Sequence, residues 1–380
     1  MPKQKKLCVE GWRGINHSYA LVNQYQLLEL KKYNFSISHK DVDFYNKNWS
    51  YKLNSAGFSK KNQIILDSLK TYDPEIKYDV TYRISYPFNT SSSNSSKLFI
   101  FGTSEFQTIE EHFYKANSLK INSGINFITP SNWSKKGFLK YGINEEKITV
   151  IPHGFNNEIY KPISKNRKTF FRKKLNIKDH EFVILSLGSM TRNKGIDILL
   201  KAFFILHHKY PHIKLILKDS SNLYNIKGAD SVRRELVSFK QFVTEDALNS
   251  IVFLSNNLDL SELNSLYSCS NCYVSPYRAE GFNIPPLEAA ASGTPVIVTK
   301  GGATDDYFHK SFGLQIEASL KSSKAKTWLE PELESLISNL ENIITGNANN
   351  LDTEFARNYL IEKFTWRAVT KKLVRKILES

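Results

Sequence analysis

Apolar strands alternate with helical segments along the second half of the sequence. Short apolar stretches predict strands at residues 181–188, 212–219, 250–255, 271–276 and 295–299. After the first of these, apolar residues recur with the period of a helix at Ile196, Leu199, Leu200, Phe203 and Phe204. This alternation is typical of a parallel sheet that helices cover on both faces. The sequence therefore predicts an α/β fold.

The chain is too long for one such sheet. At 380 residues it exceeds the size at which a single hydrophobic core usually stops growing, so two domains are expected. The first residues read as a short strand, a turn that contains Gly11 and Gly14, and a helix. This is how the first crossover of an α/β sheet begins, and it predicts a second α/β domain.

A short helix is predicted shortly before residue 293. Pro285 and Pro286 suit the first turn of a helix but not its interior, and Gly293 is a natural end. A β-branched strand, Val296–Thr299, follows at once. We therefore expect a loop, a helix of about two turns and a buried strand in this order.

Two carboxylates flank the start of that helix. Glu280 and Glu288 are separated by seven residues, in a segment of small and apolar side chains where patterning alone does not predict charges. At the junction of loop and helix, the amides of Gly281, Phe282 and Asn283 are expected to be unpaired, which suits an anion. The amides would bind phosphates, and the Glu288 carboxylate beside them would bind ribose hydroxyls. The segment therefore predicts a pocket for a nucleotide sugar. The alternative is a pair of ordinary surface glutamates.

A second cluster of candidate residues lies on the turn after the strand at 181–188. Gly188 opens this turn and Gly195 closes it, with Arg192 and Lys194 between them. Two fixed cations at this point would neutralise a leaving diphosphate. Lys218, at the end of the next strand, is a further candidate. The alternative is that these are solvated loop charges.

The two carboxylates resemble the Glu-x7-Glu signature of family 4 glycosyltransferases, the retaining enzymes of the "glycosyl transferases group 1" type. Residues 129–162, 171–177, 185–203 and 364–369 also resemble segments of that family, and they occur in the family's order. The resemblance implies the GT-B architecture, in which two Rossmann-like domains face each other across a cleft. A C-terminal helix then returns to the N-terminal domain.

The resemblance also implies domain boundaries. Residues 1–162 would form the N-terminal, acceptor-side domain, and residues 163–352 the domain that binds the nucleotide sugar. Residues 353–380 would form the C-terminal helix that crosses back to the first domain. From its apolar positions, residues 352–378 are predicted to be helical.

By the same resemblance, Glu280 faces the transferred sugar, Glu288 binds the ribose, and Lys194 with Arg192 stabilises the leaving group. The chain departs from the family at three places. Asn283 stands where the family usually has glycine, and Ser189 where it usually has arginine. In the first domain, Ser104 and Glu105 occupy a stretch where the family often has histidine.

In the predicted first domain, Gly14 is expected to approach the donor, and His17 to reach the cleft. Ser104 and Glu105 are the other acceptor-side candidates, because a carboxylate there would accept a hydrogen bond from a hydroxyl. A plain turn is an equally good interpretation of Gly11 and Gly14, since glycines by themselves are weak signals.

The net charge of +15 raises the local concentration of anionic partners around the protein. The lysines are scattered, so a solvated basic surface and a peripheral contact with an anionic membrane both remain open. No apolar run approaches the ~20 residues that span a bilayer, and no secretory signal is recognised. The expected location is the cytoplasm, with peripheral attachment to the inner membrane surface as an extension. Binding to nucleic acid is not expected.

The three cysteines do not form a disulfide framework. Cys269 and Cys272 are spaced like a metal or redox pair, but no second pair or histidine cluster accompanies them, so buried thiols are predicted. No Asp-x-Asp pattern appears where a divalent cation would bridge a diphosphate. Catalysis without a metal and without a resident cofactor is therefore expected.

Together these features predict a hexosyl-type glycosyltransferase of the EC 2.4 class. It would move a sugar from a nucleotide-sugar donor to a hydroxyl of a glycan or lipid-linked acceptor, with retention of configuration, in cell-envelope polysaccharide synthesis. Two alternatives remain. One is a sugar-nucleotide epimerase with the same fold, and the other is a non-catalytic basic protein that binds a surface or a nucleic acid.

Overall fold

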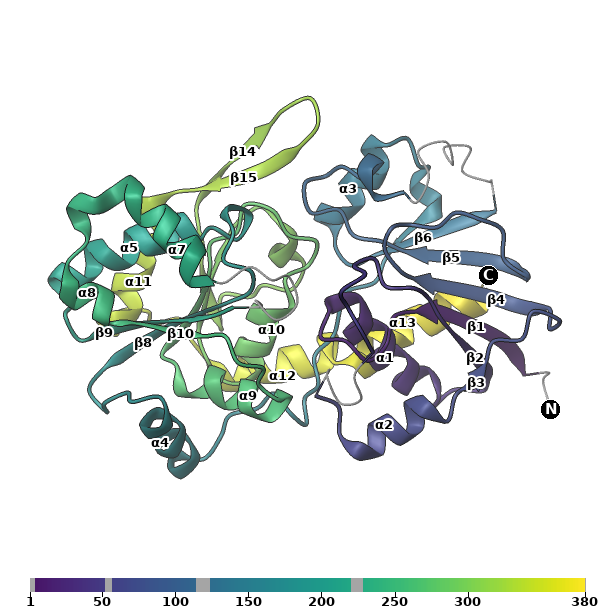
Figure 1. Cartoon of the computed structure of the whole chain (residues 1–380), viewed down its shortest axis with the longest axis horizontal. Coiled ribbons are helices and arrows are strands. Elements are labelled where there is room, and N and C mark those ends of the chain that lie inside the picture. The colour runs from purple at the N-terminus through teal and green to yellow at the C-terminus, as the bar shows by residue number, and fades with distance from the viewer. Residues whose placement is uncertain (1–3, 52–56, 114–123, 220–227, 380) are drawn as a thin grey trace. The chain divides into compact units, whose positions relative to one another are not determined.

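The chain divides into two compact units in a computed structural model that describes residues 4–51, 57–113, 124–219 and 228–379. Unit 1 comprises Met1–Gly154 with Phe364–Ser380, and unit 2 comprises Phe155–Lys363. The sequence placed these divisions after residues 162 and 352. Figure 1 shows the elements of each unit.

Unit 1 is built on a parallel sheet. In the described residues the sheet has seven strands, in the order β3-β2-β1-β4-β5-β6-β7. The strands are β1 (Lys5–Gly11), β2 (Phe35–Asp41), β3 (Lys70–Thr71), β4 (Tyr78–Ile84), β5 (Ser95–Phe101), β6 (Ile125–Thr129) and β7 (Ile148–Val150). The helices are α1 (Ser18–Leu30), α2 (Lys60–Asp67), α3 (Asn132–Lys140) and α13 (Trp366–Glu379), with short 3-10 turns η1 (Glu110–His112) and η2 (Glu145–Lys147). Consecutive residues of the central strands are buried, as expected for a sheet covered on both faces.

Unit 2 repeats this plan. Its described residues form a six-stranded parallel sheet in the order β10-β9-β8-β11-β12-β13. The strands are β8 (Phe182–Leu187), β9 (Ile213–Lys218), β10 (Ile251–Leu254), β11 (Cys272–Ser275), β12 (Val296–Thr299) and β13 (Gly313–Ile316). The order reverses between β8 and β11, and the carboxyl ends of strands at such a point are where α/β proteins bind ligands.

The helices of unit 2 follow in chain order. They are α4 (Lys165–Lys174), η3 (Arg192–Lys194), α5 (Ile196–Lys209), α7 (Gly228–Leu236), η4 (Val237–Phe242), α8 (Glu245–Asn249), α9 (Leu260–Cys269), α10 (Ile284–Ala291), η5 (Ala303–Asp306), α11 (Leu333–Ile344) and α12 (Thr353–Phe364). A separate antiparallel hairpin is formed by β14 (Ala318–Ser322) and β15 (Thr327–Pro331).

Helix α5 supplies much of the core of unit 2. Its five predicted core residues are all buried, whereas Asp197, Lys201 and His208 of the same helix are at least partly exposed. The buried residues pack with strands β8 and β9 and with α11 in one hydrophobic cluster. The face of this helix that the sequence predicts to be buried is therefore the buried face in the structure.

Helix α10 begins and ends as the sequence predicts. Asn283 precedes it in the left-handed conformation, with φ of 69°, and Pro285 and Pro286 occupy its first turn. The helix ends at Ala291, and Gly293 follows with φ of 82°. Strand β12 starts three residues later.

The C-terminal segment is two helices where the sequence predicted one. Helix α12 ends at Phe364, and Thr365 starts α13 by accepting a hydrogen bond from the Ala368 amide at 3.3 Å. The prediction of one continuous helix is wrong because this hydroxyl caps a new helix, as threonine often does.

Helix α13 belongs to unit 1, where it packs against α1 (Figure 1). The Trp366 ring stacks on Tyr25, with ring centroids 5.0 Å apart. Gly154 lies against the start of this helix, because a Cβ there would be 2.6 Å from the Trp366 nitrogen. The prediction of two Rossmann-like α/β domains with a helix returning to the first is confirmed.

Candidate functional site

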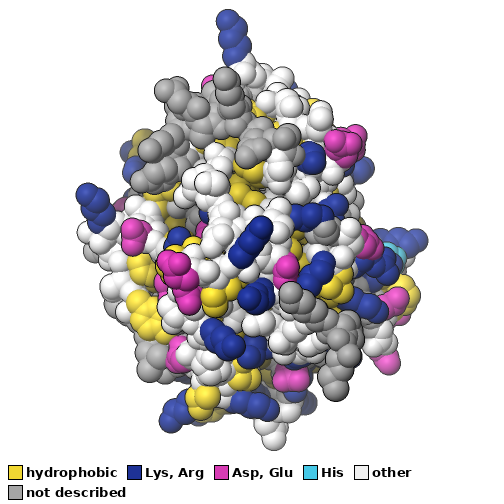
Figure 2. Space-filling model, turned by 90° about the vertical axis from the view of Figure 1, so that its right-hand side faces the viewer, with side chains coloured by type: hydrophobic (Ala, Val, Ile, Leu, Met, Phe, Trp, Pro, Cys, Tyr) yellow, Lys and Arg dark blue, Asp and Glu magenta, His cyan; other side chains and the backbone are white. Residues whose placement is uncertain are grey.

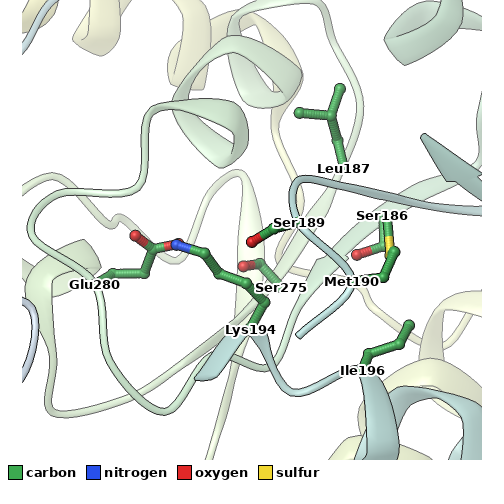
Figure 3. Close-up of a pocket in the computed structure, with 8 residues that line it drawn as sticks. All are labelled: Ser186, Leu187, Ser189, Met190, Lys194, Ile196, Ser275 and Glu280. Carbon is green, nitrogen blue, oxygen red and sulfur yellow. The ribbon is translucent and has the colours of Figure 1, made fainter. Parts of the chain in front are cut away.

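A pocket lies at the carboxyl ends of β8 and β11 in unit 2 (Figure 3). The pocket is shallow: about 290 Å³ of space lies between its walls, and this volume includes open solvent. The strand ends, the turn before α5 and the loop before α10 provide its lining, which consists of Ser186, Leu187, Ser189, Met190, Lys194, Ile196, Ser275 and Glu280. The pocket therefore combines a cation, a carboxylate and three hydroxyls with apolar side chains at the start of a helix.

Lys194 and Glu280 meet in this pocket. Figure 3 shows their side chains pointing toward each other, and the Lys194 ammonium donates to the Glu280 carboxylate at 2.7 Å. The two residues are 86 positions apart in the chain. Two of the three predicted catalytic residues therefore lie in one pocket.

Two glycines shape the turn that carries Lys194. Gly188 has φ of 137°, and a Cβ on it would meet nothing within 4 Å. Gly195 has φ of 74°, and a Cβ there would lie 1.9 Å from the Pro276 carbonyl oxygen. Only glycine therefore allows the turn to approach the segment that leads to Glu280.

Hydrogen bonds of Arg278 link the turn that carries Lys194 to the segment that leads to Glu280. Its guanidinium donates to both oxygens of Asp197, at 2.7 and 2.9 Å, and to Glu330 on β15, at 2.6 and 2.9 Å. It also donates to the Arg192 carbonyl at 2.8 Å, and its own amide donates to the Asn193 carbonyl at 2.8 Å. The side chain is 8% exposed.

The two carboxylates raise the pKa of Arg278 above its ordinary value, in spite of its burial. Arg278 is thus a positioning residue: it holds the turn of Lys194 against the loop of Glu280. It is not among the residues that the sequence predicts for the site. Its signal was an arginine in a largely apolar stretch two residues before Glu280, since a buried charge requires partners.

Glu288 lies on α10 but does not line the pocket. Its carboxylate accepts a hydrogen bond from the Tyr267 hydroxyl at 3.1 Å. Burial raises its pKa to about 7, and hydrogen bonds from Tyr160 and Tyr267 oppose that rise. Near neutral pH this carboxyl is therefore divided between its neutral and ionised forms.

Asn283 has a structural role that accounts for its identity. Its left-handed backbone is a conformation that glycine and asparagine adopt more readily than other residues. Its side-chain amide donates to the Ser275 hydroxyl at 2.9 Å, and its carbonyl accepts from the Tyr307 hydroxyl at 2.6 Å. Asn283 therefore supports the pocket through Ser275, and its amide side chain is buried.

Two predicted cations lie outside the pocket lining. The Arg192 side chain is exposed, and its backbone carbonyl serves Arg278. Lys218 is buried at the end of β9 and donates to the Asp219 carbonyl at 2.5 Å. Burial lowers the pKa of Lys218. Lys194 is the predicted cation that faces the pocket.

Gly281 and Phe282 are buried in the loop before α10. The Phe282 ring packs on Tyr307, with ring centroids 5.1 Å apart. Both residues have interactions within the protein. Phosphate binding by the amides of residues 281–283 stays a prediction.

The candidates from the first domain lie in unit 1: Gly14, which was expected to approach the donor, and the acceptor-side residues His17, Ser104 and Glu105. Gly14 has φ of 68°, and a Cβ there would be 2.2 Å from the Tyr51 ring, so packing alone explains the glycine. His17 caps α1, where its Nδ1 accepts from the Tyr19 amide at 3.1 Å. Burial lowers the His17 pKa to about 4, so the ring is neutral at pH 7.

Ser104 and Glu105 are bound into one loop of unit 1. The Ser104 hydroxyl is buried and donates to the Thr108 carbonyl at 2.9 Å. The Glu105 carbonyl accepts from the Trp133 indole at 2.7 Å. The Ser104 hydroxyl thus holds the loop together. The acceptor-side role of Ser104, Glu105 and His17 stays a prediction, and so does the approach of Gly14 to the donor.

The cysteines are buried free thiols, as predicted. Burial raises the pKa of Cys8 to about 12 and that of Cys269 to about 11, and it also raises the pKa of Cys272. In the ranges that the structure describes, no group of three His, Cys, Asp or Glu side chains is arranged to hold a metal ion. Within those ranges, no helix is long and apolar enough to cross a bilayer.

Residues 167–349, a segment within unit 2, match the family model described as "Glycosyl transferases group 1". The matched segment contains Lys194, Arg278, Glu280 and Glu288. The pocket therefore lies wholly in the part of the chain that is similar to this family.

Curated relatives are similar over part of their length. Mannosylfructose-phosphate synthase of Agrobacterium fabrum is 26% identical over 239 residues, which cover 62% of this chain and 48% of that protein. An O-antigen chain mannosyltransferase of Salmonella typhimurium is 32% identical over 159 residues, which cover 42% of this chain and 37% of that protein. The chain thus spans about half or less of the length of these relatives.

Solved structures are similar over the whole fold. Sucrose-phosphate synthase from Thermosynechococcus elongatus has a TM-score of 0.70 at 16% identity, covering 99% of both chains. HepE from Anabaena, solved in complex with UDP and glucose, has a TM-score of 0.69 at 14% identity, covering 99% of this chain and 100% of that chain. These likenesses show that the two-unit fold is the GT-B fold.

Proposed function

We propose that this protein is a glycosyltransferase that moves a sugar from a nucleotide-sugar donor to a hydroxyl group of an acceptor. The observation that carries the proposal is the pair of Lys194 and Glu280 in a pocket at the strand ends of unit 2. The similarity of this segment to group 1 glycosyl transferases supports it, as does a relative named as a mannosyltransferase.

The chemistry requires opposite charges in one place. Cleavage of the bond between sugar and diphosphate builds negative charge on the leaving group and positive charge on the sugar ring. The Lys194 ammonium would stabilise the diphosphate, and the Glu280 carboxylate would face the sugar. The start of α5, which lines the same pocket at Ile196, adds the positive end of a helix dipole.

In the proposed complex, Lys194 shares its three donors between Glu280 and a phosphate oxygen. Glu288 would accept hydrogen bonds from the two ribose hydroxyls, and Tyr267 holds its carboxylate in place. Hydroxyls of Ser189 and Ser275 are further donors on the pocket wall.

Several finer features are part of this proposal. The reaction would retain the anomeric configuration and would need no metal ion, and the sugar would be a hexose. The acceptor would be a glycan or a lipid-linked sugar of the cell envelope, a setting that one relative's name supports. The enzyme would work in the cytoplasm, in peripheral contact with an anionic membrane.

The test begins with a donor screen. UDP, GDP, ADP and their hexose conjugates are added to the purified protein, and the melting temperature is measured, because a ligand that binds only the folded state raises it. The conjugate with the largest shift is then incubated with candidate acceptors in EDTA. Product mass shows transfer, and nuclear magnetic resonance of the anomeric proton shows the configuration.

Lys194→Ala is expected to lower kcat by about 30- to 1,000-fold, because about 2–4 kcal/mol of transition-state stabilisation is lost. Lys61→Ala is the matched control, since Lys61 is an exposed lysine of α2 in unit 1. An unchanged kcat for Lys194→Ala would remove this residue from the reaction. Conversion of the donor to an epimer without acceptor would instead support an epimerase.

A further inference from the structure

The β14–β15 hairpin is a separate part of unit 2. Among the residues that the structure describes, its two strands form a two-stranded sheet of their own, apart from the six-stranded sheet. Figure 1 shows it extending beyond the other elements of unit 2. At its end, the Ser323 amide donates to the Lys326 carbonyl at 2.7 Å, and the Lys326 amide donates to the Ser323 hydroxyl at 3.1 Å. We call residues 319–326 the hairpin tip.

The hairpin tip is exposed, basic and partly apolar. All of its residues are exposed, and it contains Lys321, Lys324 and Lys326 but no acidic residue. Leu320 is 62% exposed, whereas its cross-strand partner Leu329 is buried at 3%. Trp328 is partly exposed and lies opposite Lys321 across the two strands.

We propose that the hairpin tip binds the surface of a bilayer that contains anionic phospholipids. Each lysine near such a surface strengthens binding by about fivefold. An exposed leucine gains by entering the boundary of the acyl chains. Charge complementarity and the exposed Leu320 thus indicate one kind of partner.

Two further roles for the lysines fit the hairpin tip less well. Lysines on exposed strand edges prevent pairing with other chains, but that role does not explain an exposed leucine among them. A nucleic acid would be bound by arginines and exposed aromatic faces, and the hairpin tip contains neither. The combination of lysines and leucine suits a lipid surface better.

This surface gives a location to the membrane contact of the proposed function. It does not depend on the reaction, because vesicle binding is measured without donor or acceptor. An inactive protein that binds vesicles and an active protein that does not are therefore separate outcomes.

The experiment must separate the hairpin tip from the general positive charge. On the face drawn in Figure 2, Lys and Arg side chains gather near the middle, with acidic side chains around them. The test variant is Lys321→Glu/Lys324→Glu/Lys326→Glu, which keeps a charged strand edge but reverses its sign. The matched control is Arg367→Glu/Lys371→Glu/Lys372→Glu, which makes the same charge change on exposed residues of α13.

Binding is measured by sedimentation of the full chain with vesicles of phosphatidylcholine alone, or of equal parts phosphatidylcholine and phosphatidylglycerol. We expect binding to the anionic vesicles only, at least about tenfold weaker binding by the hairpin variant, and a change within about threefold for the control. Leu320→Ser is expected to weaken binding about threefold or more. Melting temperatures should stay near that of the unmodified protein.

Three results would overturn the proposal. One is the absence of binding to anionic vesicles. Another is an equal loss of binding in the hairpin variant and the control. The third is binding to single-stranded RNA, lost in the hairpin variant, together with no binding to vesicles. Unchanged binding by Leu320→Ser would overturn the seating of Leu320 in the bilayer.

Discussion

Glu288 is the residue whose charge responds to pH near neutrality. Burial raises its pKa from the ordinary 4.5 to about 7. Between these two values the folded protein holds a proton that the unfolded chain has released. This group therefore favours the folded state at low pH, and its contribution to stability falls as the pH rises through that window.

Glu288→Gln is expected to remove this dependence. Relative to the variant, the unmodified protein should lose about 2–3 kcal/mol of unfolding free energy between about pH 5 and pH 8. Urea denaturation of both proteins at both pH values measures the difference. An equal difference in unfolding free energy between the two proteins at both pH values would show that the Glu288 carboxyl does not titrate in this range in the folded state.

Arg278 gives a second prediction for a single residue. Arg278→Ala leaves Asp197 and Glu330 without the cation that they share, so the free energy of unfolding should fall by about 2–3 kcal/mol. The fall is not larger because Glu330 is partly exposed and solvent screens its charge. Chemical denaturation measures this loss.

The kinetics separate positioning from stability alone. If Arg278 positions the turn of Lys194, Arg278→Lys should lower kcat more than it raises KM for the donor, at a temperature where the variant is fully folded. Lysine retains a charge but cannot bridge two carboxylates with a planar fork. A kcat equal to that of the unmodified enzyme would leave Arg278 a purely structural role.

At the scale of elements, the turn between β8 and α5 depends on a close contact. Gly195 and Gly346 share the left-handed conformation, with φ of 74° and 75°. A Cβ on Gly195 would lie 1.9 Å from a backbone oxygen, and one on Gly346 would meet nothing within 4 Å. The two glycines therefore differ in steric cost but not in backbone strain.

Gly346→Ala should lower the free energy of unfolding by about 1 kcal/mol, the ordinary cost of an alanine in the left-handed conformation. Gly195→Ala should cost at least about 2 kcal/mol more, since the turn must move away from Pro276. It should also lower the transfer rate, because Lys194 moves with the turn. Melting curves and initial rates of the two variants test this, and equal stabilities would contradict the contact.

Periodic elements could be predicted from the sequence. Helices α5 and α10 follow from their apolar period and their prolines, and Lys194, Glu280 and Glu288 follow from the motif around them. The partners of Arg278 could not be predicted, because Asp197 and Glu330 lie 81 and 52 residues away in the chain. Helix α13 was missed as a separate element because a single capping hydroxyl interrupts an otherwise continuous period.

The hairpin was also missed. Strands β14 and β15 are short, and the residues of β14 are largely exposed, so no clear alternation of apolar and polar residues marks them. Patterns reveal elements that bury a face. They do not reveal elements that project into solvent.

At the scale of the whole molecule, unit 1 is assembled from two separate stretches of the chain. Helix α13 contributes five buried apolar side chains to it, Trp366, Val369, Leu373, Val374 and Ile377. Removal of residues 364–380 should therefore destabilise unit 1 by several kcal/mol or unfold it, at about 1.5–3 kcal/mol for each fully buried large side chain.

Unit 2 does not include these residues, so it should keep its fold in the truncated chain. Hydrogen exchange of the truncated and full-length proteins tests this. Faster exchange in α1 and the strands of unit 1, with unchanged exchange in α5 and β8, is the expected pattern. Equal protection of unit 1 in both proteins would contradict it.

The division of unit 1 also has a consequence during translation. The ribosome makes residues 155–363 before it makes α13. Unit 2 can therefore begin to fold while the surface of α1 that α13 will cover is still exposed. A nascent chain stalled before residue 364 would thus uncover the face of the Tyr25 ring on which Trp366 stacks, an apolar surface that a chaperone can bind.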